Sequence, residues 1–170
     1  MEIKTIKHKD QRVGIFVDAQ NMYHSAKNIY GAKVNYKEVL KAAVASRVLI
    51  RAIIYVIKTE SGEEKTFFDA LSKLGFEVKE KDLQVFAGGA KKADWDVGLA
   101  VDAIKLADRL DAVILISGDG DYEPLVEYLK INKGCRVEAV AFGGTTSAKL
   151  IDAVDDFIDL SKNKKRFLIK

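Results

Sequence analysis

Cysteine and histidine are scarce in this chain of 170 residues, which contains one cysteine and two histidines. The single cysteine, Cys135, excludes an internal disulfide bond. Its position at the start of a predicted strand favours a buried, unreactive thiol over a nucleophile. The sequence has no cluster of cysteine and histidine residues of the kind that binds zinc. The chemistry of the protein must therefore rest on other residue types.

Long apolar runs and low-complexity segments are also missing. The apolar stretch at residues 48–57 contains Arg51 and is too short to cross a bilayer. The first twelve residues are charged and lack the apolar region of a secretion signal. We therefore expect a soluble protein in the reducing cytoplasm, with no membrane partner.

The basic residues are unevenly distributed. Removing the five in residues 161–170 from the total of 28 leaves 23 basic residues against 25 acidic ones. We therefore divide the chain into one domain, residues 1–160, and a basic tail, residues 161–170, that includes Lys164, Lys165 and Arg166. Such a tail is either an ordinary solvated terminus or an electrostatic arm for nucleic acid.

Strand and helix patterns alternate along the domain. Apolar and β-branched runs predict strands at residues 13–17, 48–57, 76–78, 83–86, 112–116 and 137–142. Apolar periodicity predicts helices at residues 20–27, 36–45, 63–74, 94–110, 122–130 and 147–154. Capping and turn signals support these helices: Asn35 with Glu38, Gly75, and Pro124. The alternation predicts a parallel sheet with helices on both faces.

The segment Ser117-Gly-Asp-Gly-Asp121 is the most informative loop in the sequence. It follows a buried strand and holds two carboxylates, Asp119 and Asp121, close together. Carboxylates crowded in this way repel each other unless a cation lies between them. Gly118 and Gly120 leave room for a ligand to approach the backbone. The loop therefore indicates a site for a hard metal ion.

Other polar residues are expected at the same edge of the sheet. Asp18 ends the first strand, and Asp96 lies near the start of the helix that precedes the strand at 112–116. Asn21 starts another helix there. Ligands of open parallel sheets bind beyond the carboxyl ends of the strands, near the switch in strand order. We therefore predict that these side chains meet Asp119 and Asp121 around Mg²⁺, which prefers oxygen ligands.

Simpler roles remain open for several of these carboxylates. Asp18, Asp94 and Asp121 are each at a position where they could cap a helix. Asp102 follows Asp96 by six positions and is turned about 120° away from it on a regular helix. Helical geometry therefore places Asp102 outside the immediate metal site.

Three acidic motifs resemble a known family. They are Phe16-Val-Asp-Ala-Gln-Asn21, Asp96-Val-Gly-Leu-Ala-Val-Asp102 and Ser117-Gly-Asp-Gly-Asp-Tyr-Glu-Pro-Leu-Val126. Their order and spacing are similar to those of the NYN domain, the DUF88 or LabA-like branch of the PIN-like nucleases. The resemblance covers roughly residues 12–160.

The resemblance implies a three-layer α/β/α sandwich with a mostly parallel central sheet, and an Mg²⁺- or Mn²⁺-dependent ribonuclease. It maps the catalytic metal ligands onto Asp18, Asp96, Asp119 and Asp121. Asn21, Ser117 and Asp102 have supporting positions in the same motifs.

The expected partner is RNA with accessible single-stranded segments. Lys91, Lys92 and the basic tail are candidate phosphate contacts, although all of them could be ordinary solvated residues. Trp95 and Tyr122 could stack on bases, or Trp95 could pack under its helix. The competing hypothesis is an RNA-binding or regulatory module that cleaves nothing. A homodimer also stays open, whereas Asp18-Ala-Gln20 lacks the second aspartate that a haloacid-dehalogenase-type phosphatase needs.

Overall fold

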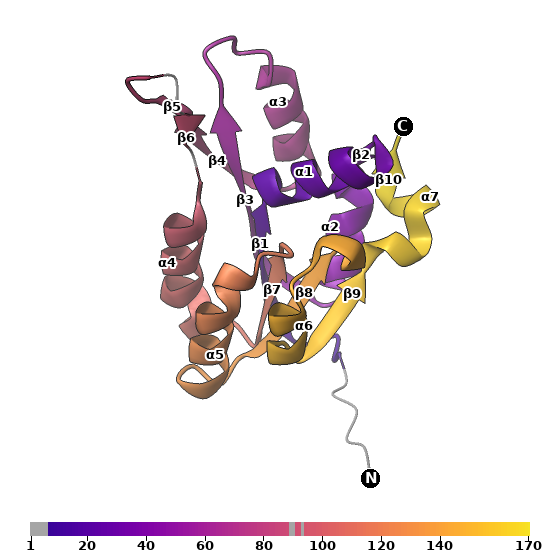
Figure 1. The fold of residues 1–170 in the computed structure, drawn as a ribbon. Coiled ribbons are helices and arrows are strands. Elements are labelled where there is room, and N and C mark those ends of the chain that lie inside the picture. The colour runs from indigo at the N-terminus through magenta and orange to yellow at the C-terminus, as the bar shows by residue number, and fades with distance from the viewer. Residues whose placement is uncertain (1–6, 89–90, 93) are drawn as a thin grey trace.

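The computed structural model describes residues 7–88, 91–92 and 94–170 (Figure 1). The side chains of Val85, Lys91 and Lys92 lie outside this description. None of the helices in the described ranges is both long and apolar enough to cross a membrane.

A six-stranded sheet forms the centre of the molecule, and all of its neighbouring strands are parallel. The strand order is β4-β3-β1-β7-β8-β9. The strands are β1 (Arg12–Asp18), β3 (Val48–Lys58), β4 (Glu77–Asp82), β7 (Ala112–Ile116), β8 (Arg136–Ala141) and β9 (Asp156–Asp159). The predicted parallel sheet is thus confirmed. Strand order reverses at β1, where a crevice at the carboxyl ends is expected.

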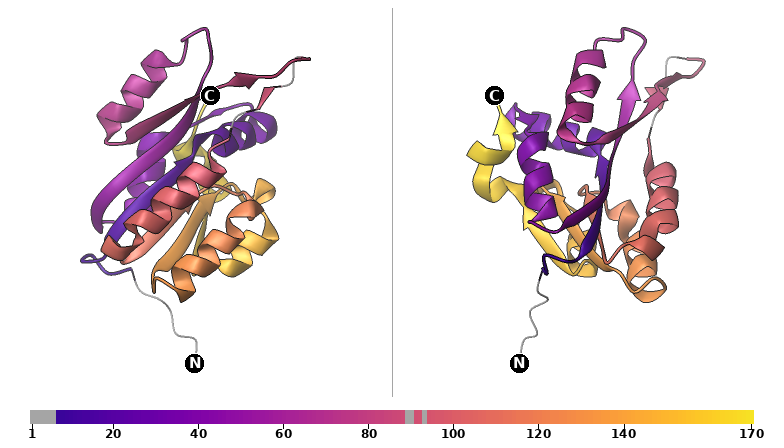
Figure 2. Two further views of the ribbon diagram at one scale, coloured as in Figure 1. Left: turned by 90° about the vertical axis from the view of Figure 1, so that its left-hand side faces the viewer. Right: turned by 180° about the vertical axis from the view of Figure 1, so that it is seen from behind.

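Helices cover both faces of the sheet (Figure 2). One face packs against α1 (Ala19–Tyr30), α2 (Tyr36–Val44), α3 (Lys65–Leu74) and the short α7 (Lys164–Phe167). The other packs against α4 (Asp96–Leu106), α5 (Glu123–Ile131) and α6 (Ala148–Ala153). The molecule therefore has three layers, as the resemblance implied.

The alternation of side chains along β1 explains why the core has two halves. Val13, Ile15 and Val17 belong to the cluster under α1 and α2. Phe16 points to the opposite face and joins the cluster under α4 and α5. Because the central strands β1 and β7 are buried on both faces, their sequences are nearly continuous apolar runs, whereas the edge strand β4 is charged and largely exposed.

The predicted helix boundaries agree with the structure where a local signal defined them. The Asn35 side chain accepts a hydrogen bond from the Glu38 backbone N–H, and so caps α2. Gly75 ends α3 in the left-handed conformation, with φ of 109°. Pro124 lies in the first turn of α5. The predicted helix at 94–110 is instead α4 followed by a 3-10 turn, Ala107–Arg109.

Two small antiparallel pairs complete the fold. In the first, β2 (Lys33–Val34) pairs with β10 (Leu168–Ile169) near the carboxyl terminus. In the second, β5 (Gln84–Val85) pairs with β6 (Lys91–Lys92). All four of these strands have two residues and depend on a partner elsewhere in the chain, and only β5 falls within a predicted strand. The basic tail is packed onto the domain through β10 and the buried Phe167.

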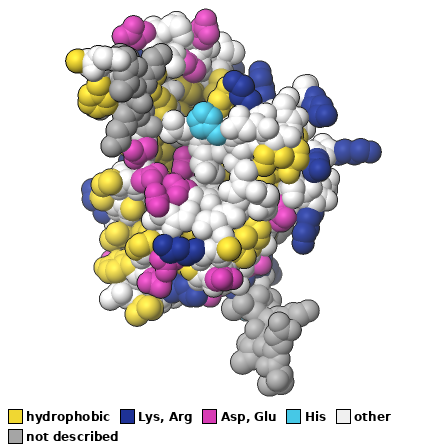
Figure 3. Space-filling view, viewed as in Figure 1, with side chains coloured by type: hydrophobic (Ala, Val, Ile, Leu, Met, Phe, Trp, Pro, Cys, Tyr) yellow, Lys and Arg dark blue, Asp and Glu magenta, His cyan; other side chains and the backbone are white. Residues whose placement is uncertain are grey.

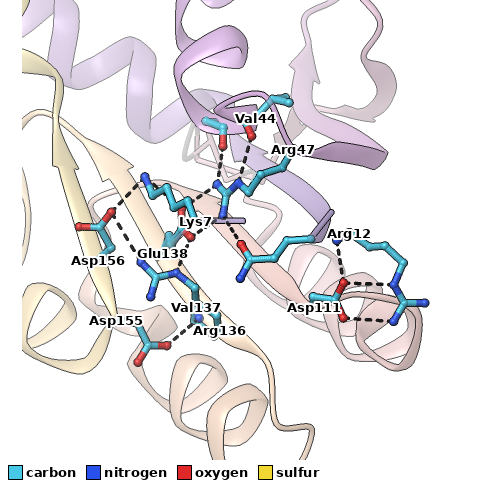
Figure 4. Close-up of polar contacts among 12 residues, drawn as sticks. Lys7, Arg12, Val44, Arg47, Asp111, Arg136, Val137, Glu138, Asp155 and Asp156 are labelled. Carbon is cyan, nitrogen blue, oxygen red and sulfur yellow. Dashed lines mark hydrogen bonds and ion pairs between the residues drawn. The ribbon is translucent and has the colours of Figure 1, made fainter. Parts of the chain in front are cut away.

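A buried ion-pair network ties β8 to the segment after α2 (Figure 4). Both side chains of the central pair, Arg47 and Glu138, are fully buried, with N–O distances of 2.7 and 3.0 Å. Arg47 also donates to the carbonyls of Ala43 and Val44 at the end of α2. Arg136 and Lys7 add positive charge around Glu138. The hydrogen bonds hold the pKa of Glu138 below its usual range, although burial acts to raise it.

Candidate metal centre

Asp18 has two roles at the junction of β1 and α1. It is the last residue of β1, and its carboxylate caps α1 by accepting the Asn21 backbone N–H at 3.2 Å. The residue is only 8% exposed. The sequence left open whether Asp18 is a cap or a ligand. The cap uses Oδ1 and leaves Oδ2 facing the hydroxyls of Ser117 and Tyr122.

A chain of hydrogen bonds joins the end of β1 to the loop after β7. The buried Ser117 hydroxyl is 3.4 Å from Oδ2 of Asp18 and accepts the Asp119 backbone N–H at 3.1 Å. The Asn21 side chain accepts the Gly118 backbone N–H at 3.0 Å. Ser117 and Asn21 therefore link the end of β1, which carries Asp18, to the loop that carries Asp119.

Asp96 reaches the same point from the opposite face of the sheet. It is the first residue of α4 and is partly buried. The Tyr122 hydroxyl donates to Asp96 at 3.0 Å and lies 3.4 Å from Oδ2 of Asp18. Tyr122 is 2% exposed, so it does not stack on a ligand and instead links two carboxylates from distant elements.

One carboxylate oxygen from each of Asp18, Asp96 and Asp119 lies within 4.8 Å of the others. None of the ion pairs among the described residues involves these three aspartates. Three close carboxylates without a cationic side chain match the oxygen donors that Mg²⁺ and Mn²⁺ prefer. The donor set therefore fits a divalent hard ion.

The electrostatics of the cluster reflect this crowding. Burial, together with the nearby charges of Asp96 and Asp119, raises the pKa of Asp18 to about 6, even though the Asn21 and Ser117 hydrogen bonds oppose it. Burial and neighbouring carboxylates also raise the pKa of Asp96. A cation bound between Asp18 and Asp96 would stabilise the ionised form of both carboxylates and lower their pKa values.

Asp121 does not join the other three carboxylates. Among the described residues, the metal-competent group contains Asp18, Asp96 and Asp119 only, and Asp121 is exposed. Asp121 does not cap α5, whose first turn has no side-chain cap. Asp119 instead caps the 3-10 turn Gly120–Tyr122, because its carboxylate accepts the Asp121 backbone N–H at 2.9 Å. The loop thus turns Asp121 toward solvent.

Asp102 is also held away from the cluster, as helical geometry predicted. It accepts hydrogen bonds from the Tyr55 hydroxyl at 2.8 Å and from Lys79 Nζ at 2.6 Å. Burial acts to raise the pKa of Asp102, but the Lys79 and Tyr55 hydrogen bonds outweigh it and lower the pKa. Asp102 therefore anchors α4 to β3 and β4.

Trp95 and the loop glycines have structural neighbours. The Trp95 indole N–H donates to the Val56 carbonyl at 2.9 Å, so the ring packs against β3. A Cβ at Gly118 would lie 2.9 Å from Thr146 Oγ1, and one at Gly120 would lie 2.6 Å from Ser147 Oγ. The 145–147 loop, and not a ligand, is what approaches these two glycines closely.

The predicted basic contacts occupy separate parts of the surface. Lys91 and Lys92 form β6, but their side chains lie outside the described structure. Arg166 pairs with Glu38 at 2.7 Å, and Lys164 Nζ lies 5.0 Å from the centre of the Tyr30 ring. Lys165 lies between them on α7 and is exposed.

An open cleft of about 360 Å³ leads to the three aspartates. Its other walls come mainly from α1, through Gln20, Asn21, His24, Ser25 and Asn28, together with Asp94 and Thr145. Figure 3 shows acidic side chains gathered on this face of the molecule. The cleft lies at the carboxyl ends of β1 and β7, where the strand order reverses.

Comparisons with known proteins agree with this geometry. The NYN domain model matches residues 12–161. The chain is 29% identical to the low amplitude and bright protein LabA of Synechococcus elongatus over 161 residues, which is 90% of this chain and 86% of LabA. It also resembles the crystal structure of VPA0982, a Vibrio parahaemolyticus protein of unknown function. That similarity has a TM-score of 0.86 and 32% identity, and it covers 97% of this chain and all of the other.

The family model spans most of the chain and contains all three clustered aspartates. The alignment with VPA0982 extends the similarity to nearly the whole fold. The chain is therefore a member of the NYN domain family, within the PIN-like nuclease superfamily.

Proposed function

We propose that this protein is a cytoplasmic, Mg²⁺- or Mn²⁺-dependent ribonuclease that hydrolyses phosphodiester bonds of single-stranded RNA. The observation that carries the proposal is the convergence of Asp18, Asp96 and Asp119 within 4.8 Å at the floor of an open cleft. Membership of the NYN family supports RNA as the substrate.

Asp18, Asp96 and Asp119 would hold the metal in this proposal. A divalent ion bound to these carboxylates would polarise the phosphodiester and lower the pKa of a water molecule, which supplies the nucleophile at neutral pH. Asp121 is proposed to act from the rim of the cleft through solvent, since its side chain is exposed.

The protein's own residues hold the carboxylates in position. The buried Tyr122 hydroxyl donates to Asp96 and lies close to Asp18. Ser117 and Asn21 link the end of β1 to the loop after β7. Each of these groups is fixed by burial or by a backbone contact. The ligand oxygens would therefore need little rearrangement when an ion enters.

The basic residues are proposed to contact RNA phosphates outside the cleft. Lys165 on α7 is exposed, and Lys91 and Lys92 precede the helix that carries Asp96. Arg166 and Lys164 already contact Glu38 and Tyr30, so they would contribute mainly through long-range attraction.

Cleavage of end-labelled RNA tests the proposal. Single-stranded and duplex RNA of mixed sequence are incubated with protein and Mg²⁺, Mn²⁺ or chelator, and the new ends are mapped. We expect cleavage of the single strands that requires metal and falls at least about 100-fold in Asp119→Asn, because one carboxylate ligand is lost. Asp152→Asn, an exposed aspartate on α6, is the matched control and should cleave normally.

Equal cleavage by wild type and Asp119→Asn would assign the activity to a contaminant. Metal-dependent RNA binding without new ends would instead support a binding or regulatory module.

A further inference from the structure

The metal cleft has no lysine or arginine among the described residues that line it. Four lining residues are aspartates, namely Asp18, Asp94, Asp96 and Asp119, and the others carry amides, hydroxyls and one imidazole. Every nucleotide of an RNA strand adds a negative charge. A metal ion at the clustered aspartates neutralises the phosphate that it binds, but the flanking phosphates would face the acidic walls. A strand that crosses the cleft therefore needs a cation close to it.

Lys81 supplies such a cation at the rim of the cleft. It lies on β4, beside the segment that leads into α4 (Figure 1). Its Nζ donates to the Asp94 backbone carbonyl at 2.8 Å. Asp94 lines the cleft, and its carboxylate accepts the Asp96 backbone N–H at 3.2 Å. The ammonium group is therefore bonded to a cleft residue two positions before a clustered aspartate.

The charge of Lys81 is not compensated within the described structure. Lys79, two positions earlier on β4, points to the same face of the strand, and its Nζ lies 2.6 Å from the Asp102 carboxylate. The partners of Lys81 are instead a carbonyl and an indole ring, which are both neutral. Lys81 belongs to none of the ion pairs formed between described residues. Its positive charge is thus available to an anion.

The position of the Lys81 ammonium group is fixed, although the residue is exposed. Nζ lies 4.4 Å from the centre of the Trp95 ring, and this cation–π contact acts together with the hydrogen bond to Asp94. A side chain that is already ordered loses less entropy when it binds a ligand. The Asp94 carbonyl uses only one N–H of the ammonium group, so the others remain for phosphate oxygens.

We propose that Lys81 binds a phosphate of the RNA strand next to the one at the metal, so that the strand leaves the cleft over the start of α4. The inference rests on the proposed function for its ligand, RNA. It adds a contact residue and a direction for the strand.

The salt dependence of RNA binding tests this contact. A fluorescently labelled single-stranded RNA of mixed sequence is titrated with protein in chelator, and anisotropy is followed at several salt concentrations. In Lys81→Gln, affinity should fall about fivefold at about 0.1 M salt. The slope of log affinity against log salt should shrink by about 0.7, which is the contribution of one phosphate contact in a single strand. Lys81→Arg keeps the charge and should keep the wild-type slope.

A matched variant and two further measurements separate this contact from a general or structural effect. Lys105→Gln makes the same charge change at an exposed position of α4, about 13 Å along the helix axis from Asp96, and should leave the slope unchanged. Calorimetric titration with Mn²⁺ and urea unfolding should show no loss in Lys81→Gln. A merely structural role for Lys81 would lower Mn²⁺ affinity or stability and leave the slope unchanged.

Equal affinities and slopes for wild type and Lys81→Gln, an equal loss in Lys105→Gln, or no RNA binding would overturn the inference. If wild type cleaves RNA with metal while Lys81→Gln binds RNA like wild type, the Lys81 proposal fails and the nuclease proposal stands. If Lys81→Gln weakens RNA binding while wild type produces no new ends, the Lys81 proposal stands and the nuclease proposal fails.

Discussion

Asp18 combines demands that oppose each other. As a helix cap it accepts a backbone hydrogen bond, which favours the ionised carboxylate. Its burial beside two other carboxylates favours the protonated form, and the net result is a pKa of about 6. In the metal-free protein, the ionised Asp18 side chain therefore lowers the stability of the fold at neutral pH. This conflict predicts an effect on stability.

Asp18→Asn should stabilise the metal-free protein at neutral pH. Because the folded pKa is raised above the ordinary value of 3.8, protonation of Asp18 stabilises the fold fully below about pH 4. This contribution is lost as the pH rises through about 6. A shift of two units corresponds to about 3 kcal/mol at most, and asparagine, which carries no charge, avoids the loss.

Urea unfolding in chelator at pH 4.5 and 7.5 measures this effect. Asp18→Asn should be more stable than wild type at pH 7.5, and the difference should shrink at pH 4.5. Adding Mn²⁺ should stabilise wild type but not the variant. A variant that is less stable than wild type at pH 7.5 would contradict the electrostatic account.

Tyr122→Phe should weaken metal binding without unfolding the protein. The change removes only the hydroxyl that donates to Asp96, and it keeps the buried ring. Loss of a group that orients a ligand typically costs tenfold or more in metal affinity. Calorimetric titration with Mn²⁺ measures the change, and Tyr128→Phe, on the outer part of α5, serves as the control.

At the scale of elements, the start of α4 decides where Asp96 points. Trp95 lies directly before the helix, and its ring packs between Val56 and the helix backbone. A Cβ at Gly98 would lie 2.6 Å from Cε3 of this ring. Gly98 therefore lets the indole cover the first turn, which fixes Asp96 at the cluster.

Gly98→Ala should destabilise the protein, although alanine is normally the better helix former by about 1 kcal/mol. Insertion of a methyl group into this contact should cost about 1–3 kcal/mol. Urea unfolding gives the sign of the change, and Mn²⁺ affinity should fall with it. Val97→Ala, at a position 76% exposed on the same helix, should cause no loss. Stabilisation by Gly98→Ala would show that Trp95 does not constrain the helix.

The sequence predicted the elements that local signals define. The strands at 13–17 and 112–116 and the caps at Asn35 and Gly75 are confirmed because apolar runs and capping side chains act within a few residues. The pairing of β2 with β10 was missed, because two-residue strands have no signal of their own.

The site was predicted to the same extent. The order of strands and helices predicts that Asp18, Asp96, Asp119 and Asp121 lie at one edge of the sheet, and the structure brings the first three together. The linking role of Tyr122 was not predicted, because it depends on where a buried hydroxyl points after packing. The orientation of Asp121 was not predicted either. It depends on the 3-10 turn after Asp119, which the order of strands and helices does not reveal.

At the scale of the whole molecule, charge is arranged differently at the two edges of the sheet. At the carboxyl edge, Asp18, Asp96 and Asp119 lie close together and form no ion pair with any described residue, whereas the Arg47–Glu138 network neutralises the charges buried near the start of β8. The paired charges of Arg47 and Glu138 stabilise the packing of the fold. The unpaired carboxylates in the cleft are instead typical of a ligand-binding site.

Arg47→Met should therefore be strongly destabilising, by about 3–5 kcal/mol, because it leaves Glu138 buried with weaker compensation. The double variant Arg47→Met with Glu138→Gln should recover part of this loss. Thermal unfolding of the four proteins completes a double-mutant cycle. Additive losses would mean that the two side chains act independently, and Mn²⁺ affinity should not change in any variant that folds.

The pairing of β10 with β2 has a practical consequence for laboratory work. Lys33 pairs in register with Ile169 and lines a cavity between α1, α3 and the carboxyl end of β3. An affinity tag fused after Lys170 would begin close to this cavity and obstruct it. Lys7, by contrast, is tied to Glu138 and Asp156, at the start of β8 and β9. Fusion partners and surface immobilisation are therefore better attached ahead of Lys7.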